Sequence, residues 1–359
     1  MAKVLGKGAH FAYWTHCPPG HDPKHNPQGV ACAATPYSII DHMSKPLCKK
    51  VEVYPALQPE LFRLDKQSNP HTRVVWSYDA EARKRQAKAL RALRAVKFPQ
   101  GIATARSGKT LFDNVRPHRN NRQFYLTDFD DAYGRVNQDV MNEKVEDILH
   151  KHARGRQYDA VRVIIGEYMA DGAFLDGVDG LPQGNATSAD LFNWYMYDAD
   201  NALAFALWKR RDTTKEVATR YLDDLTVSSP AADGVSKQTR RLVREIYENN
   251  APGMQVKHPK SKVLTLGPKP VTVTGLTIYP DGRIAPSPPL LDAANMVFGE
   301  MAAKLAEDQQ FDLHDYSVVA GYNGVLNLAG ESSRSGSRMV RSMGKQAARL
   351  MHEIGDRIN

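Results

Sequence analysis

The chain has 359 residues, of which 42% are hydrophobic and 25% are charged, a composition typical of a globular protein large enough to bury one or more cores. The longest apolar stretch, residues 202–208, is far too short to span a membrane, and the N-terminus lacks the apolar core of a secretory signal. We therefore expect a cytoplasmic protein with no membrane partner. The formal net charge of +8 favours a polyanionic partner such as a nucleic acid, although many basic proteins bind none.

The first part of the chain predicts irregular structure followed by one basic helix. Residues 1–50 contain many Pro, Gly and His residues and no long period, which predicts an extended, loop-rich arm. Residues 51–76 alternate short apolar runs with turn residues, which predicts strands around a hairpin tip at 68–70. Asp79 can cap a helix that continues to about Lys97. The many Lys and Arg residues of this helix fit either a solvated face or a surface that follows a nucleic-acid backbone.

The rest of the chain alternates predicted strands and helices. The segments in chain order are a strand at 124–127, a helix at 138–152, an ambiguous apolar run at 161–165, a long helix at 187–211, strands at 217–222 and 225–229, a helix at 236–250, strands at 262–266 and 271–279, and mostly helix from about 290. Consecutive strands and helices in this order fit an α+β fold.

Three carboxylates form a pattern that core packing would not produce. Asp128 ends a predicted strand, and Asp223 and Asp224 occupy the tip of a predicted hairpin. Adjacent acids repel each other unless a cation lies near them, and Mg²⁺ prefers oxygen ligands, including phosphate oxygens. Two such ions about 3.5–4 Å apart can activate an attacking hydroxyl and stabilise a leaving pyrophosphate. An Asp-Asp turn alone is a weak signal, because solvated loops contain most of them.

The motifs around these acids resemble those of reverse transcriptases, in the order in which that family carries them. Residues 124–133 (Phe-Tyr-Leu-Thr-Asp-Phe-Asp-Asp-Ala-Tyr) resemble the first palm motif, an acid followed five residues later by an aromatic residue. Residues 181–188 (Leu-Pro-Gln-Gly-Asn-Ala-Thr-Ser) resemble the second motif, a loop that opens a helix. Residues 220–225 (Arg-Tyr-Leu-Asp-Asp-Leu) resemble the YxDD hairpin, and residues 273–276 lie where the family places its primer-grip strand.

This resemblance implies an α+β right-hand polymerase with fingers, a palm made of an antiparallel sheet backed by helices, and a helical thumb. It implies an N-terminal arm at 1–50, fingers at 51–118, a palm with finger elements at 119–285 and a thumb at 286–359. The implied activity is that of an RNA-directed DNA polymerase, a nucleotidyltransferase that uses two Mg²⁺ ions.

The resemblance also assigns roles to particular residues. Asp128, Asp223 and Asp224 would be the catalytic metal ligands. Tyr133 would lie beneath the incoming sugar and exclude a 2′-hydroxyl, and ordinary core packing is the alternative for its ring. Gln183 and Gly184 would contact the nucleotide or template-primer, since a residue without a side chain lets the backbone approach closely.

Several basic residues are candidates for contacts with phosphate. Lys66 and Arg73 flank the predicted hairpin where fingers of this family contact the triphosphate, and cations there neutralise charge that develops in phosphoryl transfer. Lys260 would be the catalytic general acid that protonates pyrophosphate, with Lys262 as the alternative. Residues 107–110 (Ser-Gly-Lys-Thr) look like the end of a phosphate-binding P-loop, but the upstream glycine does not fit the required spacing, so we interpret the segment as a loop of the fingers.

Three further segments resemble the retron branch of bacterial reverse transcriptases. Residues 114–118 (Asn-Val-Arg-Pro-His) stand where retron enzymes carry NAxxH, residues 273–275 (Val-Thr-Gly) match their VTG signature, and residues 319–324 resemble a thumb element. This resemblance implies that Asn114 and His118 bind RNA. It also implies a structured noncoding RNA as template and primer, a short single-stranded DNA product, and a role in anti-phage defence with a separate effector protein.

Other assignments stay open. The arm at 1–50 and the faint finger pattern at 60–90 depart from retron enzymes, so CRISPR-associated, group II intron-like and other bacterial defence branches are alternatives. Two functions of other kinds are an RNA-binding scaffold, against which the three intact acids argue, and an RNA-dependent RNA polymerase.

The end of the chain is basic. Arg334, Arg338 and Arg341 would bind RNA, because a helical thumb with repeated cations suits an A-form duplex that is recognised by its shape and backbone. A solvated helix face is the alternative for these residues.

Overall fold

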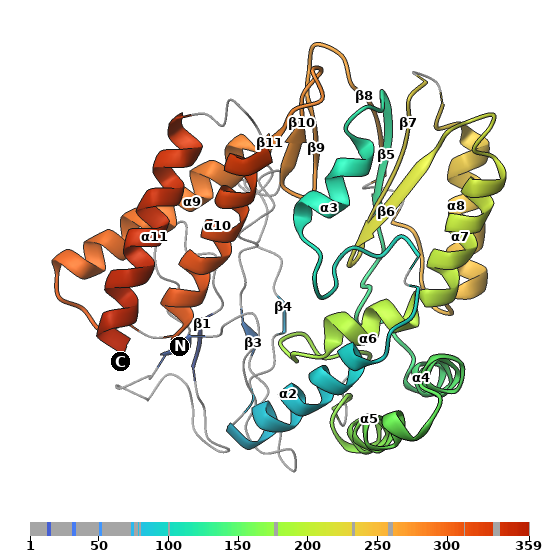
Figure 1. The fold of residues 1–359 in the computed structure, drawn as a ribbon, viewed down its shortest axis with the longest axis horizontal. Helices are drawn as coiled ribbons and strands as arrows, with labels where there is room; N and C mark the ends of the chain where they lie inside the picture. The colour runs from blue at the N-terminus through green and yellow to red at the C-terminus, as the bar shows by residue number, and fades with distance from the viewer. Residues whose placement is uncertain are drawn as a thin grey trace. The chain divides into compact units, whose positions relative to one another are not determined.

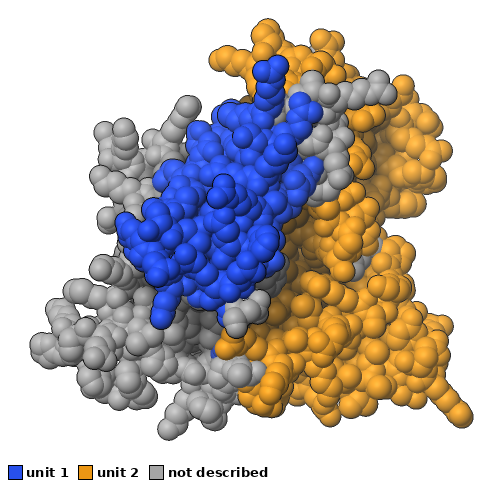
Figure 2. Space-filling view, turned by 60° about the vertical axis from the view of Figure 1, so that its left-hand side comes forward, with its two compact units in different colours: residues 1–78, 275–277, 284–359 blue, residues 79–274, 278–283 orange. Residues whose placement is uncertain are grey.

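The computed structural model describes residues 13–15, 31–33, 50–51, 73–74, 78, 80–99, 101–175, 179–231, 234–257, 261–311, 313–332 and 338–358. The chain forms two compact units, coloured separately in Figure 2. The larger unit comprises residues 79–274 and 278–283, and the smaller unit comprises 1–78, 275–277 and 284–359. The predicted division into arm, fingers, palm and thumb stays a prediction.

A four-stranded antiparallel sheet forms the centre of the larger unit (Figure 1). Its strands are β5 (Gln123–Asp128), β6 (Val217–Tyr221), β7 (Asp224–Ser229) and β8 (Lys262–Thr265). The strand order is β6-β7-β5-β8, so β5 is paired on both sides. The predicted strands are confirmed, and the two motifs that carry the acids lie on adjacent strands.

Helices pack around this sheet and complete the core of the larger unit. They are α2 (Ala80–Ala95), α3 (Leu111–Val115), α4 (Gln138–His152), α5 (Asp159–Asp171), α6 (Ser188–Tyr195), α7 (Tyr197–Lys209) and α8 (Lys237–Asn250), with 3₁₀ turns η2 (Arg116–His118) and η3 (Arg156–Tyr158). One buried cluster joins Tyr125 and Leu225 of the sheet to Trp194 of α6 and to Val243 and Tyr247 of α8. Burial of such side chains is the main stabilising contribution to a fold of this kind.

Two helix starts follow from side-chain capping. Asn137 accepts a hydrogen bond from the Val140 N–H at the start of α4, whose predicted bounds are confirmed. Thr110 and Asp113 form a reciprocal capping box at the start of α3. The P-loop-like segment therefore ends in a helix cap, in agreement with its interpretation as a loop.

The predicted helix at 187–211 is two helices that meet at Met196. Met196 has ψ of −3°, outside the regular helical range, and it is the boundary residue of both α6 and α7. The two helices have different partners: α6 packs against α2 and α4, whereas α7 packs against α8 and β6. Continuous helical periodicity in the sequence could not reveal this change of partner. The ambiguous run at 161–165 is helical and belongs to α5.

Part of the basic face of α2 is engaged within the larger unit. Arg85 forms an ion pair with Asp171 at 2.6 Å, and Arg94 forms one with Asp190 at 3.1 Å. These two cations tie α2 to α5 and α6. The choice between a solvated face and a nucleic-acid surface therefore concerns the other basic residues of the helix.

The smaller unit contains a group of three mutually packed helices among its described residues: α9 (Pro288–Ala306), α10 (Leu313–Ser332) and α11 (Arg338–Ile358). The buried residues of α11 recur at helical spacing, as expected for one apolar face: Val340, Met343, Ala347, Leu350 and Ile354. The prediction of a mostly helical segment from about residue 290 is confirmed.

The other strands of the described chain are short. They are β1 (Tyr13–Thr15), β2 (Ala31–Ala33), β3 (Lys50–Val51), β4 (Arg73–Val74), β9 (Val271–Val273), β10 (Leu276–Ile278) and β11 (Ile284–Pro286). β9, β10 and β11 form a sheet of order β11-β10-β9. The predicted strand at 271–279 is interrupted because Thr274 and Gly275 both have positive φ, 44° and 81°. No helix among the described residues is long and apolar enough to cross a membrane.

Candidate active site

The three acids of the sequence motifs lie at one edge of the central sheet. Asp128, the last residue of β5, is the direct cross-strand partner of Asp224, the first residue of β7. Asp223 precedes Asp224 in the turn, and its carbonyl accepts a hydrogen bond from the Phe129 N–H at 3.3 Å. Side chains of directly opposed residues project from the same face of a sheet, and like charges there destabilise the pairing. A cation at this edge would relieve that repulsion.

The turn between β6 and β7 is tight. Tyr221 pairs with Asp224, so Leu222 and Asp223 form a two-residue loop. Leu222 has φ of 54°, a region in which a side chain costs about 1–2 kcal/mol. This conformation needs support from the surrounding structure.

A buried ion pair beneath the turn supplies that support. Arg220 is fully buried, and its guanidinium lies 2.6 Å from a carboxylate oxygen of Asp200 on α7. The Tyr247 hydroxyl donates to the same carboxylate at 2.8 Å, and burial raises the pKa of that hydroxyl well above its usual value, reinforced by the charge of Asp200. Arg220 also donates from Nη1 to the Leu222 carbonyl at 2.7 Å. Arg220 therefore connects α7 and α8 to the backbone of the turn that carries Asp223.

Tyr133 lies next to the second motif. Its ring stacks on Phe192 with centroids 5.2 Å apart and planes 16° apart, and its carbonyl accepts from the Leu181 N–H at 2.9 Å. Burial first, and then the charge of Asp223, raise the pKa of the Tyr133 hydroxyl. A Cβ on Gly180 would collide with the Tyr133 carbonyl oxygen, so the approach of the two segments requires glycine. The structure thus brings together the first motif, the second motif and the hairpin.

The loop that opens α6 is held by its own polar residues. Gly184 has φ of 98°, which favours glycine, and Gln183 and Gly184 are both half-buried. Asn185 accepts from the Tyr168 hydroxyl at 2.9 Å. Thr187 is the N-cap residue of α6, but its hydroxyl donates to Asn185 instead of capping the helix. The contact of Gln183 and Gly184 with nucleotide stays a prediction.

The sheet edge that carries Asp128, Asp223 and Asp224, here called the acid edge, fits divalent ions that arrive with substrate. No group of three His, Cys, Asp or Glu side chains among the described residues is gathered closely enough to hold a metal ion. Mg²⁺ is usually bound through one or two carboxylates together with substrate phosphates, so a preformed cage is not required. The oxygen chemistry and the shared sheet edge of Asp128, Asp223 and Asp224 agree with such a site.

Lys257 is a residue of this edge that the sequence did not single out. Its ammonium lies 2.9 Å from Asp130, and its N–H donates to the Asp128 carbonyl at 2.8 Å. The hydrogen bond to Asp130 is the main cause of the raised pKa of Lys257, with further contributions from Asp128 and Asp131. Lys257 and Arg135 lower the pKa of Asp130, which is therefore engaged by two cations. No motif marks this lysine, because the fold brings it to the edge through the segment before β8.

Asn114 and His118 are fully buried inside the larger unit. Asn114 donates to Thr274 at 2.9 Å. The ring nitrogens of His118 lie 2.5 Å from the Ser228 hydroxyl and 2.7 Å from the Thr219 hydroxyl, and burial lowers its pKa to about 3. Neither side chain is accessible to RNA in this structure. Their contact with RNA stays a prediction, and the geometry gives them a structural role that links the 114–118 segment to β6 and β7.

The remaining predicted site residues belong to the smaller unit or lie outside the described chain. Lys66, Lys260 and Arg334 lie outside the described residues. Arg73 is described as backbone, at the start of β4. Arg338 and Arg341 are exposed in the first turns of α11.

The fold, an antiparallel sheet backed by helices with the three acids at one sheet edge, is polymerase-like. The model of the family described as reverse transcriptase (RNA-dependent DNA polymerase) matches residues 64–278, more than half of the chain. The chain therefore belongs to the reverse transcriptase family. Enzymes of this family are RNA-directed DNA polymerases, a class of nucleotidyltransferase, and they generally use divalent metal ions. The predicted α+β fold, with an antiparallel sheet backed by helices, is confirmed.

Comparisons with other proteins give fold-level likeness alone. No curated protein matches the sequence. One similar solved structure is telomerase from Candida albicans in complex with a fragment of telomeric RNA (TM-score 0.47, 13% identity, covering 86% of this chain and 63% of that chain). A second is telomerase from Candida tropicalis with the same kind of fragment (TM-score 0.44, 11% identity, covering 88% of this chain and 62% of that chain). A third is the RNA-dependent RNA polymerase of a human picobirnavirus (TM-score 0.42, 13% identity, covering 91% of this chain and 62% of that chain). The chain spans less than two thirds of the length of each of these proteins, and the family assignment rests on the sequence match.

Proposed function

We propose that this chain is an RNA-directed DNA polymerase that copies a structured noncoding RNA into short single-stranded DNA. The observation that carries the proposal is the cross-strand pairing of Asp128 with Asp224. Asp223 lies beside this pair in the turn, and burial together with the charge of Asp223 raises the pKa of the Tyr133 hydroxyl. Family membership supports the reaction class. The whole reaction, its template and its partners are inferred from these features together.

Asp128, Asp223 and Asp224 would hold two Mg²⁺ ions, which when bound would activate the primer hydroxyl and stabilise the leaving pyrophosphate. Arg220 would keep the turn, and with it Asp223, in place between rounds of addition. Tyr133 would lie under the sugar and exclude a 2′-hydroxyl, with its ring fixed by Phe192. Lys260 would protonate the leaving pyrophosphate.

The retron branch is the assignment that the sequence motifs favour. Asn114 and His118 belong to one of those motifs, and their buried contacts with Thr274, Thr219 and Ser228 support a role in holding the palm. On this assignment the partners are a structured RNA, the DNA product and a separate effector protein, and the setting is cytoplasmic anti-phage defence. Other bacterial branches would share the palm and differ in the RNA.

The test is to purify the protein from cells that encode it and to sequence the nucleic acid bound to it, with Asp223→Ala/Asp224→Ala as the matched control. A discrete RNA joined to a short DNA, with the DNA absent from the variant, is the expected result. DNA without a linked structured RNA would move the protein to another branch. RNA without DNA from both forms would favour an RNA-binding scaffold and contradict the proposal.

A further inference from the structure

Two aromatic side chains at the end of α7 lie on the surface of the larger unit. Phe205 and Trp208 are each 54% exposed. Their rings are nearly parallel, with centroids 5.8 Å apart and planes 16° apart. Aromatic side chains are usually buried where they can be, because each carries a large apolar area. An adjacent, stacked and exposed pair is therefore a feature that the core of this unit does not explain.

Cations cover the aromatic pair. The Lys209 ammonium lies 4.4 Å from the centroid of Phe205, and the Arg211 guanidinium lies 4.9 Å from the centroid of Trp208. Arg211 has an ion pair with Asp212 at 3.8 Å, but the two side chains are 59% and 92% exposed, so the pair contributes little. Arg211 is therefore able to move from the Trp208 ring and to cover a flat group placed there.

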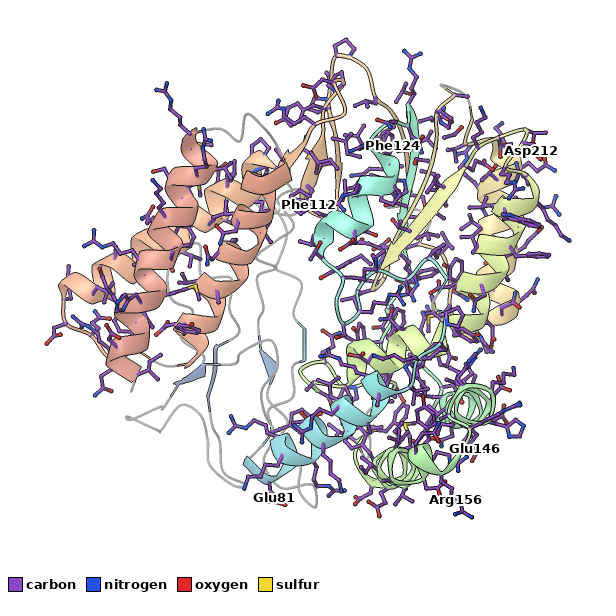
Figure 3. The ribbon with its side chains drawn as sticks, in the orientation of Figure 1. Glu81, Phe112, Phe124, Glu146, Arg156 and Asp212 are labelled. Atoms are coloured by element: carbon purple, nitrogen blue, oxygen red, sulfur yellow. The ribbon has the colours of Figure 1, made fainter. Side chains whose placement is uncertain are left out.

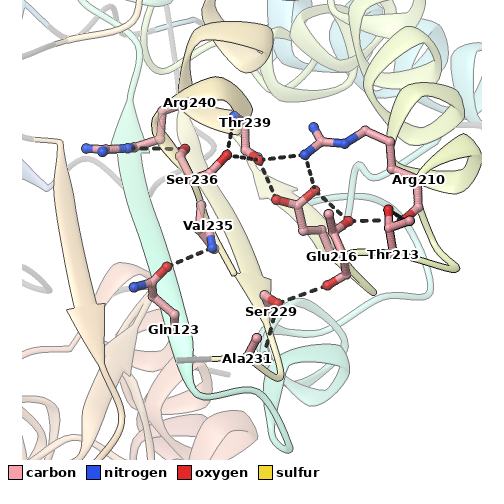
Figure 4. Close-up of polar contacts among 11 residues, drawn as sticks. Gln123, Arg210, Thr213, Glu216, Ser229, Ala231, Val235, Ser236, Thr239 and Arg240 are labelled. Carbon is pink, nitrogen blue, oxygen red and sulfur yellow. Dashed lines mark hydrogen bonds and ion pairs between the residues drawn. The ribbon is translucent and has the colours of Figure 1, made fainter. Parts of the chain in front are cut away.

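Hydrogen bonds and an ion pair fix the segment that carries these residues to the rest of the larger unit (Figure 4). Arg210 forms an ion pair with the buried Glu216 at 3.4 Å and donates to the Thr239 hydroxyl at 3.1 Å. Ser229 donates to the Thr214 carbonyl at 3.0 Å. These contacts join the end of α7 to β7 and α8. A surface that is already ordered loses less entropy when it binds a ligand.

The exposed charge of this segment is positive. Glu216 is buried and engaged by Arg210, which leaves Lys209, Arg211 and Lys215 against Asp212 at the surface. Figure 3 marks Asp212 directly after α7. Flat rings accompanied by cations suit a nucleobase and its phosphate, and proteins bind single strands by this combination. A purely apolar protein partner would leave these cations without a counter-charge.

We propose that Phe205, Trp208, Lys209 and Arg211 form a second binding site, for single-stranded nucleic acid, with a base stacked on Trp208. The site is distinct from the acid edge, because β6 begins just after this segment and Asp223 follows the far end of that strand. Five residues of strand span about 16 Å. This inference rests on the proposed function in one respect, that the chain handles RNA.

The test is equilibrium binding of a fluorescent single-stranded 12-nucleotide RNA to the full chain, without divalent metal or nucleotides. Trp208→Ala is expected to weaken binding about 5- to 100-fold, the range for loss of one base–aromatic stack, and Trp208→Phe is expected to retain most of it. Lys209→Gln/Arg211→Gln is expected to reduce the dependence of affinity on salt. Val163→Ala is the matched control, because Val163 is 58% exposed on α5 and lies outside the site.

Affinity of Trp208→Ala equal to that of the original chain would overturn the proposal. Concentration-dependent self-association that Trp208→Ala abolishes, with RNA affinity unchanged, would also overturn it and assign the surface to a second copy of the chain. Because the assay contains no nucleotide or metal, it reports binding in a chain that polymerises and in one that does not. Primer extension by the original chain tests the proposed function separately.

Discussion

Replacement of Asp200 by alanine removes the carboxylate that pairs with the buried Arg220 guanidinium. The side chains are 0% and 1% exposed, so the variant leaves a charge in the core without its counter-ion. Removal of one partner of a buried ion pair costs about 3–5 kcal/mol. That is a large part of the 5–15 kcal/mol typical of a domain. We expect the urea midpoint of the larger unit to fall accordingly.

A second variant separates the fold from the function of this pair. In Asp200→Leu/Arg220→Met no charge is left buried, and such replacements are often neutral or stabilising. The variant still lacks the bond from Arg220 to the Leu222 carbonyl, so the turn at φ 54° loses its support. We therefore expect most of the stability to return while primer extension remains at least about tenfold slower, a loss of about 1.4 kcal/mol in transition-state stabilisation.

Urea unfolding and single-turnover primer extension, both measured well below the unfolding temperature, provide the assay. Glu245→Ala is the control, because its pair with Arg241 is exposed on α8 and contributes little to stability. A cost below about 1 kcal/mol for Asp200→Ala would refute the buried-pair argument. Full activity of the double variant would refute the role of Arg220 in positioning the turn.

Three further predictions follow from other contacts. Gly180→Ala is expected to destabilise the larger unit by more than about 2 kcal/mol in urea unfolding, because φ is 69° and the added Cβ meets the Tyr133 carbonyl. Gly166→Ala in α5, where nothing lies near the added Cβ, is expected to stabilise the unit by about 1 kcal/mol. Equal effects of the two variants would contradict the packing of Gly180 against Tyr133. The pKa of His118 falls to about 3 on folding, so the folded state binds fewer protons than the unfolded state. The contribution of His118 to the free energy of unfolding therefore keeps its full value above about pH 6.5 and falls by about 1.4 kcal/mol per pH unit between about pH 6.5 and about pH 3. His118→Gln should remove this part of the pH dependence of the free energy of unfolding, and an unchanged pH dependence would contradict the burial of His118. Lys257→Met removes a positive charge close to Asp128, so it should lower the Mg²⁺ concentration for half-maximal primer extension several-fold, whereas Lys257→Arg should leave that concentration unchanged. A higher Mg²⁺ requirement in Lys257→Met would contradict the argument.

The strand and helix pattern of the larger unit follows closely from its sequence. The short apolar run at 124–126 and the helical period in 138–152 are both local properties of the chain. The break at Met196 and the turn at Thr274 depend on which elements pack on either side, and local periodicity does not record that.

The candidate site divides in the same way. Asp128, Asp223 and Asp224 could be named as candidates from sequence because these acids stand at the ends of predicted strands within recognisable motifs. No sequence signal marks Lys257 or the Arg220–Asp200 pair, because their partners come from segments distant in the chain. Asn114 and His118 belong to a sequence motif, but only the three-dimensional structure shows that they are buried.

Incorporation of a single nucleotide on an RNA template–primer tests the central claim most directly. We expect Mg²⁺-dependent addition of the matching deoxynucleotide, strong preference over the ribonucleotide, and loss of addition in Asp223→Asn. Tyr133→Ala should narrow the preference at least about tenfold, and Tyr133→Phe should keep it, because the ring and not the hydroxyl fills the space beneath the sugar. Ribonucleotide preference with Tyr133 intact, or addition that survives Asp223→Asn, would contradict the assignment of this site as the centre of a reverse transcriptase.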